Sequence, residues 1–250
     1  MSNQVVQPIR PAATVIIARN ADTEIEIFML RRTSKASFAG GMYVFPGGRV
    51  ESDDHLHSYD AFRTGPSEAQ TLQQIALGNE WRGYWIAAIR ECFEESGLLL
   101  AYDETGNLFE YENDQTRERF NNWRHEIHEG GCTLADVCRA ENLKLAVDHV
   151  HFFNRWITPL GRPRRFDTRF FIAEAPMHQT GEHDAKETVD SIWISPRQAL
   201  ERHAKDEFGL MVVTRVQLEA LLEFESLNSL SQARAGATEF PTHRPVLPRA

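Results

Sequence analysis

One segment of the chain, WIAAIRECFEESGL at residues 85–98, restricts the fold more than any other. Its apolar residues fall on one stripe at helical spacing, and Gly97 stands where a helix commonly ends. We therefore expect an amphipathic helix that buries one face. The same helix carries Glu91, Glu94 and Glu95 at the spacing i, i+3 and i+4, so three carboxylates can share a face away from most of the apolar stripe.

These three glutamates have two interpretations. Like charges at this spacing each destabilise an isolated helix by roughly 0.2–0.5 kcal/mol, and a bound divalent cation would remove that repulsion. Carboxylate oxygens without a nearby histidine favour Mg²⁺ or Mn²⁺ over zinc. Such a triplet on its own is more typical of a solvated helix surface. The choice between a metal site and a surface therefore depends on the sequence around the helix.

The segment at residues 90–98 resembles the second half of the Nudix box, Arg-Glu-aliphatic-x-Glu-Glu-x-Gly-aliphatic, at every fixed residue. Upstream, VFPGG at residues 44–48 resembles the strand and turn that lead into that box. The first half of the box, Gly-x5-Glu, is similar to residues 48–54, with Asp54 in place of glutamate. Because Arg90 follows the glycine by 42 residues and not by 14, 28 extra residues must loop out. Loops lengthen at little cost, about 0.6 kcal/mol for each doubling.

Further similarity lies downstream, in WITP at 156–159, RRFDT at 164–168 and FF at 170–171, which resemble the bacterial relatives of the peroxisomal coenzyme A diphosphatases. The resemblance implies the α/β fold class, as a Nudix α/β/α sandwich with a mixed sheet and helical insertions. It also implies that the glutamate-bearing helix packs on the sheet with its carboxylates toward the metals.

The resemblance also implies the roles of the helix residues. Glu91, Glu94 and Glu95 would hold Mg²⁺ or Mn²⁺, which bridges a diphosphate and lowers the pKa of an attacking water. Arg90 is counted with Glu91 and Glu94 as catalytic, because it can pair with Glu94 at i+4 and orient the carboxylates. An ordinary surface ion pair is the alternative for Arg90. Phosphate binding is expected at the glycine turn and at two arginines that enter a strand: Gly47, Gly48, Arg164 and Arg165.

The resemblance allows a general base from the helix or from a later loop. Glu187, in the polar loop GEHDAKETVD, is the candidate, with Glu182 next. The alternative is that both are solvated loop acids, and Arg164 and Arg165 have structural ion pairs as their alternative. The string HEIH at residues 125–128 lacks the HExxH spacing that brings two imidazoles together, so no zinc site is expected there.

The rest of the chain reads as alternating strands and helices. Residues 10–225 are expected to form a single Nudix domain, with insertions at about 55–82 and 107–150, followed by a C-terminal arm at 226–250. Apolar runs predict strands and capping signals predict helices. The expected strands are ATVIIA, EIEIFMLRR, MYVFP, 151–158, 166–175 and SIWIS. A first helix is expected between a cap at Ser67 and an end at Gly78, and two more within 114–142 around Thr133. Another is expected to start at Ser195-Pro196, and a final one to cover about 214–222.

Composition limits the partners. The formal charge of −9 argues against nucleic acid and anionic membranes, so an anionic substrate must be captured by local cations or metal. No run of about 18 apolar residues and no basic leader is present, and three cysteines suit reduced thiols, so we expect a cytoplasmic protein without structural disulfides. The exposed insertions and the proline-containing arm would suit a homodimer.

Together these features predict a metal-dependent Nudix hydrolase that cleaves the diphosphate linkage of a nucleoside diphosphate derivative. Coenzyme A or an acyl-CoA is the first hypothesis, on resemblance alone. Another substrate of the same chemistry, such as ADP-ribose, NADH or a dinucleotide, is the second hypothesis. A non-catalytic module that senses a ligand is the third, and the complete set of Arg90, Glu91, Glu94 and Glu95 argues against it.

Overall fold

A long strand, β1 (Ile9–Asn20), lies at the centre of the fold. The structure is a computed structural model that describes residues 7–246 except 23, 37 and 185. Strand β1 pairs antiparallel with β2 (Ile25–Arg32) and parallel with β9 (Arg165–Glu174). The main sheet has the order β10-β2-β1-β9-β8-β11, and two short strands pair with its inner strands, β3 with β2 and β4 with β1. Its other members are β3 (Tyr43–Val44), β4 (Gly47–Arg49), β8 (Val150–Ile157), β10 (Thr188–Ile194) and β11 (Thr242–His243).

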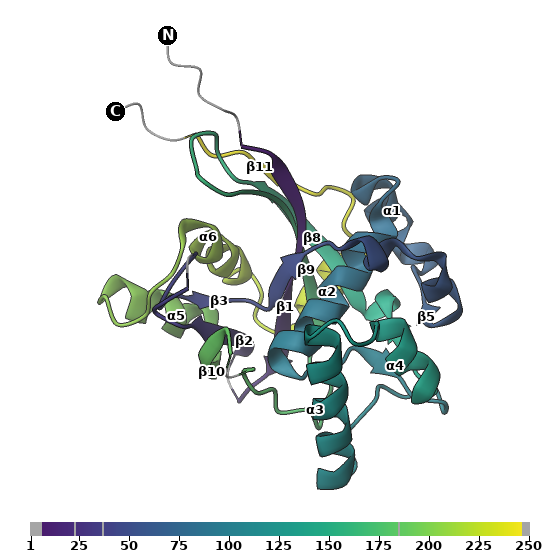
Figure 1. Cartoon of the computed structure of the whole chain (residues 1–250). Helices are drawn as coiled ribbons and strands as arrows, with labels where there is room; N and C mark the ends of the chain where they lie inside the picture. The colour runs from purple at the N-terminus through teal and green to yellow at the C-terminus, as the bar shows by residue number, and fades with distance from the viewer. Residues whose placement is uncertain (1–6, 23, 37, 185, 247–250) are drawn as a thin grey trace.

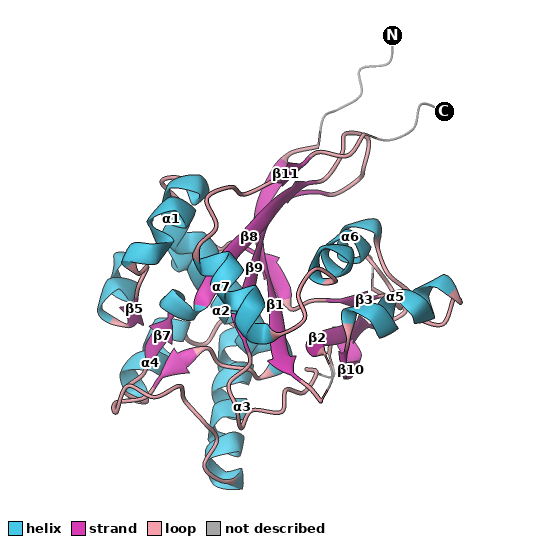
Figure 2. Cartoon of the chain, turned by 180° about the vertical axis from the view of Figure 1, so that it is seen from behind, coloured by secondary structure: helices cyan, strands magenta, loops and turns pink. Residues whose placement is uncertain are grey.

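The two faces of β1 are buried in two different cores. Val15 and Ile17 belong to the core under α2 (Trp81–Ser96), whereas Ile16 and Ala18 belong to a second core with Leu218 and Leu230. Alternating side chains of one strand point to opposite faces, so the sheet is covered by helices on both sides. Figure 1 shows α2 in front of the sheet, and Figure 2, the view from the opposite side, shows α7 (Leu227–Ala235) on the other face. The predicted α/β/α sandwich with a mixed sheet is confirmed.

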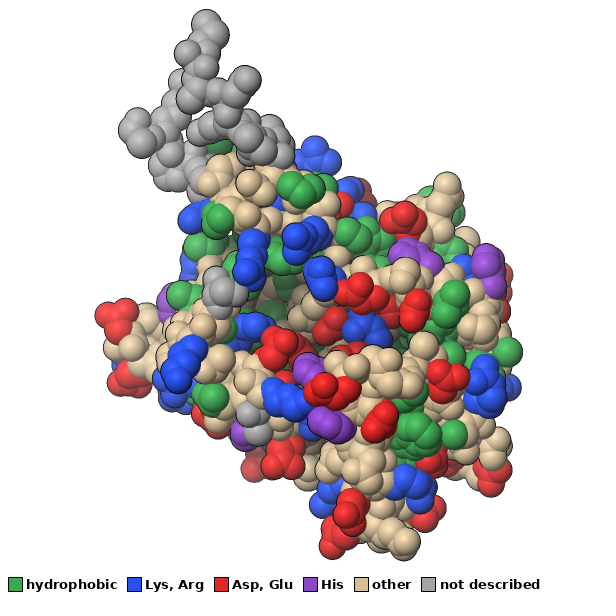
Figure 3. All heavy atoms as spheres, viewed as in Figure 1, with side chains coloured by type: hydrophobic (Ala, Val, Ile, Leu, Met, Phe, Trp, Pro, Cys, Tyr) green, Lys and Arg blue, Asp and Glu red, His purple; other side chains and the backbone are tan. Residues whose placement is uncertain are grey.

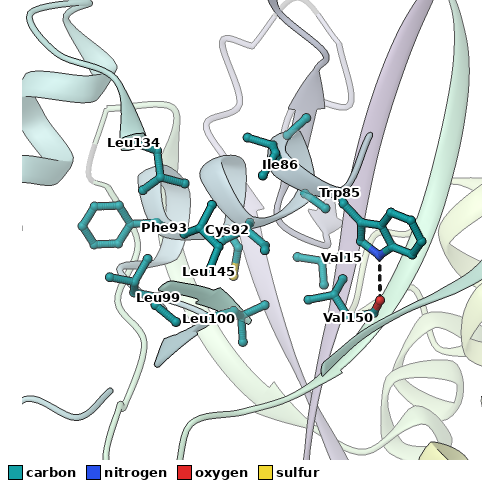
Figure 4. Close-up of a cluster of buried hydrophobic side chains, with 14 of the residues drawn as sticks. Val15, Trp85, Ile86, Cys92, Phe93, Leu99, Leu100, Leu134, Leu145 and Val150 are labelled. Carbon is teal, nitrogen blue, oxygen red and sulfur yellow. Dashed lines mark hydrogen bonds between the residues drawn. The ribbon is translucent and has the colours of Figure 1, made fainter. Parts of the chain in front are cut away.

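Helix α2 is held by its apolar stripe. Trp85, Ile86, Cys92 and Phe93 are fully buried, and the Trp85 indole N–H donates to the Val150 carbonyl at 2.7 Å (Figure 4). The helix ends as predicted at Gly97, which has φ 70°, a left-handed conformation that favours glycine. It starts at Trp81, four residues earlier than the expected segment.

Both predicted insertions contain helices. The first includes α1 (Thr71–Leu77), preceded by a capping box at Ser67 and followed by Gly78. The second includes α3 (Asp114–His128) and α4 (Leu134–Ala140), whose cap is Thr133, as expected. The rings of Phe93 and Phe120 lie 6.4 Å apart, so α3 packs on α2. The smaller elements are η1 (Ser52–His55), η2 (His57–Ala61), β5 (Arg63–Thr64), η3 (Glu68–Gln70), β6 (Ala101–Tyr102), β7 (Lys144–Ala146) and η4 (Val147–His149).

Residues 196–246 contain more regular secondary structure than the sequence predicted. Helices α5 (Pro196–Ala204) and α6 (Val212–Leu221) were expected, but α7 and β11 were not. Ser226 caps α7, and the helix buries Leu227 and Leu230 in the second core. The expectation that the helix near 214–222 is the last one is therefore wrong.

Two general expectations concern cysteines and membranes. Cys92, Cys132 and Cys138 are all free thiols, and two of them are buried. Within the described part of the chain, no helix combines the length and the hydrophobicity needed to cross a membrane.

Candidate active site

A cavity of about 1220 Å³ opens beside the glutamate-bearing face of α2. Figure 3 shows the corresponding hollow, with acidic side chains inside it and basic side chains along its upper edge. Its walls come from segments far apart in the sequence: the β4 turn, the connection between α3 and α4, and the outer ends of β1, β8 and β9. Glu91, Glu94 and Glu95 all line it.

Arg90 connects the acidic residues of this cavity. Its guanidinium donates to both carboxylate oxygens of Asp54, at 2.8 and 2.9 Å. Its Nη1 also donates to Glu91 Oε1 at 3.0 Å and to Glu94 Oε1 at 2.9 Å. The predicted contact between Arg90 and Glu94 is therefore present. Because one planar guanidinium contacts three carboxylates, it fixes their positions relative to one another.

Asp54 was a departure from the motif and had no assigned role in the sequence. The structure buries it almost completely, with 1% of its surface exposed. Its second oxygen also accepts the Glu51 backbone N–H at 2.8 Å, which completes the capping box of η1. Although 28 extra residues separate the two halves of the motif in the sequence, the halves are in direct contact through the ion pair between Asp54 and Arg90.

The glycine turn lies directly against the α2 carboxylates. The Gly47 N–H donates to Glu95 Oε2 at 2.9 Å. A Cβ atom at Gly48 would lie 2.5 Å from the Glu91 carboxylate, so a larger residue would displace it. Both glycines line the cavity, at a place where only backbone without a side chain can approach the helix.

Burial and mutual repulsion set the protonation of two carboxylates. Burial, together with the charge of Glu94, raises the pKa of Glu91 to about 7, although Arg90 acts in the opposite direction. Burial and the charge of Glu91 raise the pKa of Glu95 well above its usual value, against the hydrogen bond from Gly47. Oxygen donors whose charges repel are suited to a hard divalent cation. Among the described residues, no three acidic, histidine or cysteine side chains already converge as a complete metal site.

The remaining predicted residues are placed as follows. Glu187 and Arg164 line the cavity, and Glu187 accepts a hydrogen bond from Arg32 at 3.1 Å. Arg165 is not among the lining residues; its guanidinium donates to the carbonyls of Thr158 at 3.2 Å and Gln7 at 3.3 Å. The second-choice base, Glu182, is not among the lining residues either.

His128 and Arg32 are among the lining residues that were not predicted from the sequence. His128, at the end of α3, lies 3.8 Å from Glu94 Oε2, and Arg32 binds Glu187 from β2. No spacing rule links them to α2, because the insertion and the sheet bring them there. His125 contacts Lys186 at 3.4 Å, so the two histidines of HEIH have different partners.

The mixed sheet between two helical layers, with an Arg-Glu-x-x-Glu-Glu-x-Gly helix on the cavity, defines the class of protein as a Nudix hydrolase. A solved NUDIX hydrolase from Alicyclobacillus acidocaldarius superposes with a TM-score of 0.75 and 24% identity, covering 90% of this chain and 96% of that one, so the two share a fold. Residues 60–212, more than half of the chain, match the model of the NUDT19 Nudix domain. The chain belongs to the NUDT19 Nudix domain family.

Curated relatives carry a more specific name. The acyl-coenzyme A diphosphatase NUDT19 of Xenopus laevis is 26% identical over 251 residues, which cover 89% of this chain and 66% of that protein. The protein of the same name from Gallus gallus is 27% identical over 266 residues, which cover 88% and 70%. This chain thus spans about two thirds of the length of these relatives.

Proposed function

We propose that this chain is a metal-dependent hydrolase of the diphosphate linkage in coenzyme A or an acyl-CoA. The observation that carries the proposal is the set of cavity-facing carboxylates fixed by Arg90 beside the Gly47-Gly48 turn. The names of the Xenopus and Gallus relatives support the choice of substrate. The cavity, at about 1220 Å³, is somewhat larger than the roughly 300–1,000 Å³ of most small-molecule pockets, which leaves room for a ligand as large as coenzyme A.

Each site residue has a role in this proposal. Glu91, Glu94 and Glu95 would hold Mg²⁺ or Mn²⁺, which when bound neutralises charge on the diphosphate and activates a water. Arg90 keeps Glu91 and Glu94 in position. Glu187 is the candidate to accept the proton of the attacking water, because it faces the same cavity.

The phosphates would be bound by backbone and guanidinium groups. The Gly47-Gly48 turn brings backbone without side chains up to the carboxylates, and Arg164 supplies positive charge from the cavity wall. The role of Arg165 as a phosphate ligand stays a prediction, because its guanidinium donates its hydrogen bonds to two backbone carbonyl oxygens in this structure. A cytoplasmic location is part of the proposal and is supported by the three free thiols. A homodimer also stays a prediction.

Product analysis separates the proposed substrate from ADP-ribose, NADH and dinucleotides. Each compound is incubated with the protein and Mg²⁺ or Mn²⁺ in ¹⁸O-water, and the products are identified by mass spectrometry. We expect coenzyme A to give phosphopantetheine and adenosine 3′,5′-bisphosphate, with ¹⁸O in one of them. Rapid cleavage of ADP-ribose beside untouched coenzyme A would reject the substrate, and cleavage of none would favour the ligand-sensing alternative.

The site itself is tested by Glu94→Gln. We expect kcat to fall by about 10²-fold or more, because the amide loses the negative charge that the cation and Arg90 contact. Glu118→Gln, on the exposed face of α3 and outside the cavity, is the matched control and should retain full activity. Unchanged hydrolysis by Glu94→Gln would mean that the site is wrongly assigned.

A further inference from the structure

One face of the main sheet forms the floor of the cavity. Alternate residues in the first part of β1 and in the first part of β9 line it, and the two strands are in register along this stretch. The paired floor residues are Thr14 with Phe170, Ala12 with Thr168, and Arg10 with Phe166. The middle pair has small side chains, so the floor is continuous from the first pair to the last.

The register gives the length of this floor. Thr14 pairs with Gly47, and the Gly47 N–H donates a hydrogen bond to the Glu95 carboxylate. The end of the floor at Thr14 therefore lies beside the α2 carboxylates. Arg10 is four residues away on the same strand, which corresponds to about 13 Å at ~3.3 Å per residue. Arg10 and Phe166 therefore form a second, outer end of the cavity, about 13 Å along the strand from the end beside the carboxylates, which leaves room for a nucleoside between the two ends.

Aromatic side chains at the outer end offer surfaces to a planar group. The rings of Phe38 and Phe166 have centroids 6.0 Å apart and are tilted by 58°, so neither covers the face of the other. Phe38 is 42% exposed, although it is a large apolar side chain on the cavity wall. Such rings bind a nucleobase by stacking.

Charge also differs between the two ends. At the inner end each arginine already has an acidic partner: Arg90 has Asp54, and Arg32 has Glu187. At the outer end, Arg10 is exposed and has no acidic partner among the described residues, and Arg164 lines the same end. In a protein of net charge −9, a cation of this kind on a cavity wall is suited to an anionic group of a ligand.

We infer that the outer end binds the nucleoside of the substrate, with the base against Phe38 and Phe166 and a separate ribose phosphate at Arg10 and Arg164. The inference deepens the proposed function and rests on it for the position of the diphosphate. Coenzyme A carries a 3′-phosphate in addition to its diphosphate, whereas ADP-ribose and NADH do not. This subsite would therefore select coenzyme A among diphosphates that share an adenosine.

Calorimetric titration of the full chain tests the subsite without any turnover. The probes are adenosine 3′,5′-bisphosphate and AMP, which differ by the ribose phosphate. Wild-type protein should bind the bisphosphate about tenfold more tightly, as expected for one charge-assisted hydrogen bond. Arg10→Gln should reduce that preference to less than about twofold while leaving the affinity for AMP unchanged. Phe38→Ala should weaken both probes by about tenfold, because both lose the stacked base.

Arg19→Gln is the matched control, because Arg19 belongs to the same strand but does not line the cavity. It should retain the wild-type preference. The inference is overturned if wild-type protein binds the two probes with equal affinity or binds neither. It is also overturned if Arg10→Gln keeps the full preference for the bisphosphate, or if Phe38→Ala binds both probes as tightly as wild type. An equal loss for both probes in Arg10→Gln would also overturn it. If the binding preferences hold but coenzyme A is not cleaved, the proposed function fails and the subsite stands.

Discussion

Asp54 and Arg90 show how much a single buried carboxylate determines in this site. Arg90 is 12% exposed at its side chain and contacts three acids, but only Asp54 accepts two of its hydrogen bonds. The motif in the sequence identified Arg90, Glu91, Glu94 and Glu95, because their spacing on one helix is fixed. The contact between Arg90 and Asp54 could not be predicted from spacing, because 28 inserted residues lie between the two halves of the motif that carry them.

Asp54→Ala tests this contact. Loss of Asp54 removes two hydrogen bonds from the largely buried Arg90 but leaves Glu91 and Glu94 beside it, so we expect the free energy of unfolding to fall by about 1.5–3 kcal/mol. Urea titration followed by circular dichroism measures it. Asp114→Ala is the control, because Asp114 is 99% exposed at its side chain and pairs with Arg117 at 3.5 Å; it should cost less than about 1 kcal/mol. Equal effects of the two variants would contradict the buried-pair interpretation.

At the scale of elements, the close approach of β4 to α2 is the contact on which the site depends. Gly48→Ala would place a methyl group where the Glu91 carboxylate lies, and the carboxylate must move. We expect kcat/KM to fall by about 10²-fold, as for a displacement near 1 Å at a catalytic centre. Steady-state kinetics measure this fall.

The control for Gly48→Ala is Gly236→Ala. A methyl group at Gly236, after α7, meets its nearest neighbour at 3.4 Å and is remote from the cavity. This variant should keep wild-type kinetics. Wild-type activity in Gly48→Ala would show that Glu91 tolerates displacement and is not a critical ligand.

The elements with a clear period or cap were predictable, and those that depend on tertiary contacts were not. Gly97 and Thr133 marked helix boundaries that the structure reproduces. The two-residue strand β11 has no sequence signal of its own and exists through its pairing with β8. Helix α7 buries only Leu227 and Leu230 at an i, i+3 spacing, too few apolar positions to give a recognisable period.

At the scale of the whole molecule, the buried acids make stability depend on pH and metal. The pKa of Glu91 is raised to about 7 in the folded protein from an ordinary 4.5, so the unfolded chain loses this proton at lower pH. A raised folded-state pKa contributes stability below about pH 4.5 that is lost as pH rises through about 7. Glu95 acts in the same direction.

The free energy of unfolding of chelator-treated protein should therefore decrease over this window, by up to about 1.4 kcal/mol per pH unit for each group. Urea titrations at several pH values measure the slope. Saturating Mg²⁺ should reduce the slope, because a bound cation keeps the carboxylates ionised in the folded state. Glu91→Gln should reduce the slope in the absence of metal, because only Glu95 then contributes. A slope that neither Mg²⁺ nor this substitution changes would place its origin elsewhere.

The cavity as a whole could not be predicted from the sequence, because its walls are assembled from distant segments. His128 comes from an insertion, Phe38 from a loop after β2, and Arg10 from the start of β1. Spacing within one element fixes residues on that element only. The helical half of the site was therefore predictable, and the outer half needed the sheet register.

That register has a consequence for how such an enzyme could change its preference for substrate size. Successive side chains of β1 point to opposite faces, so a shift by one residue would turn Arg10 away from the cavity. The separation between the outer cation and the carboxylates can change only by two residues at a time, about 6.6 Å. Relatives that keep this sheet are expected to fall into discrete length classes, and intermediate lengths would require a bulge in β1.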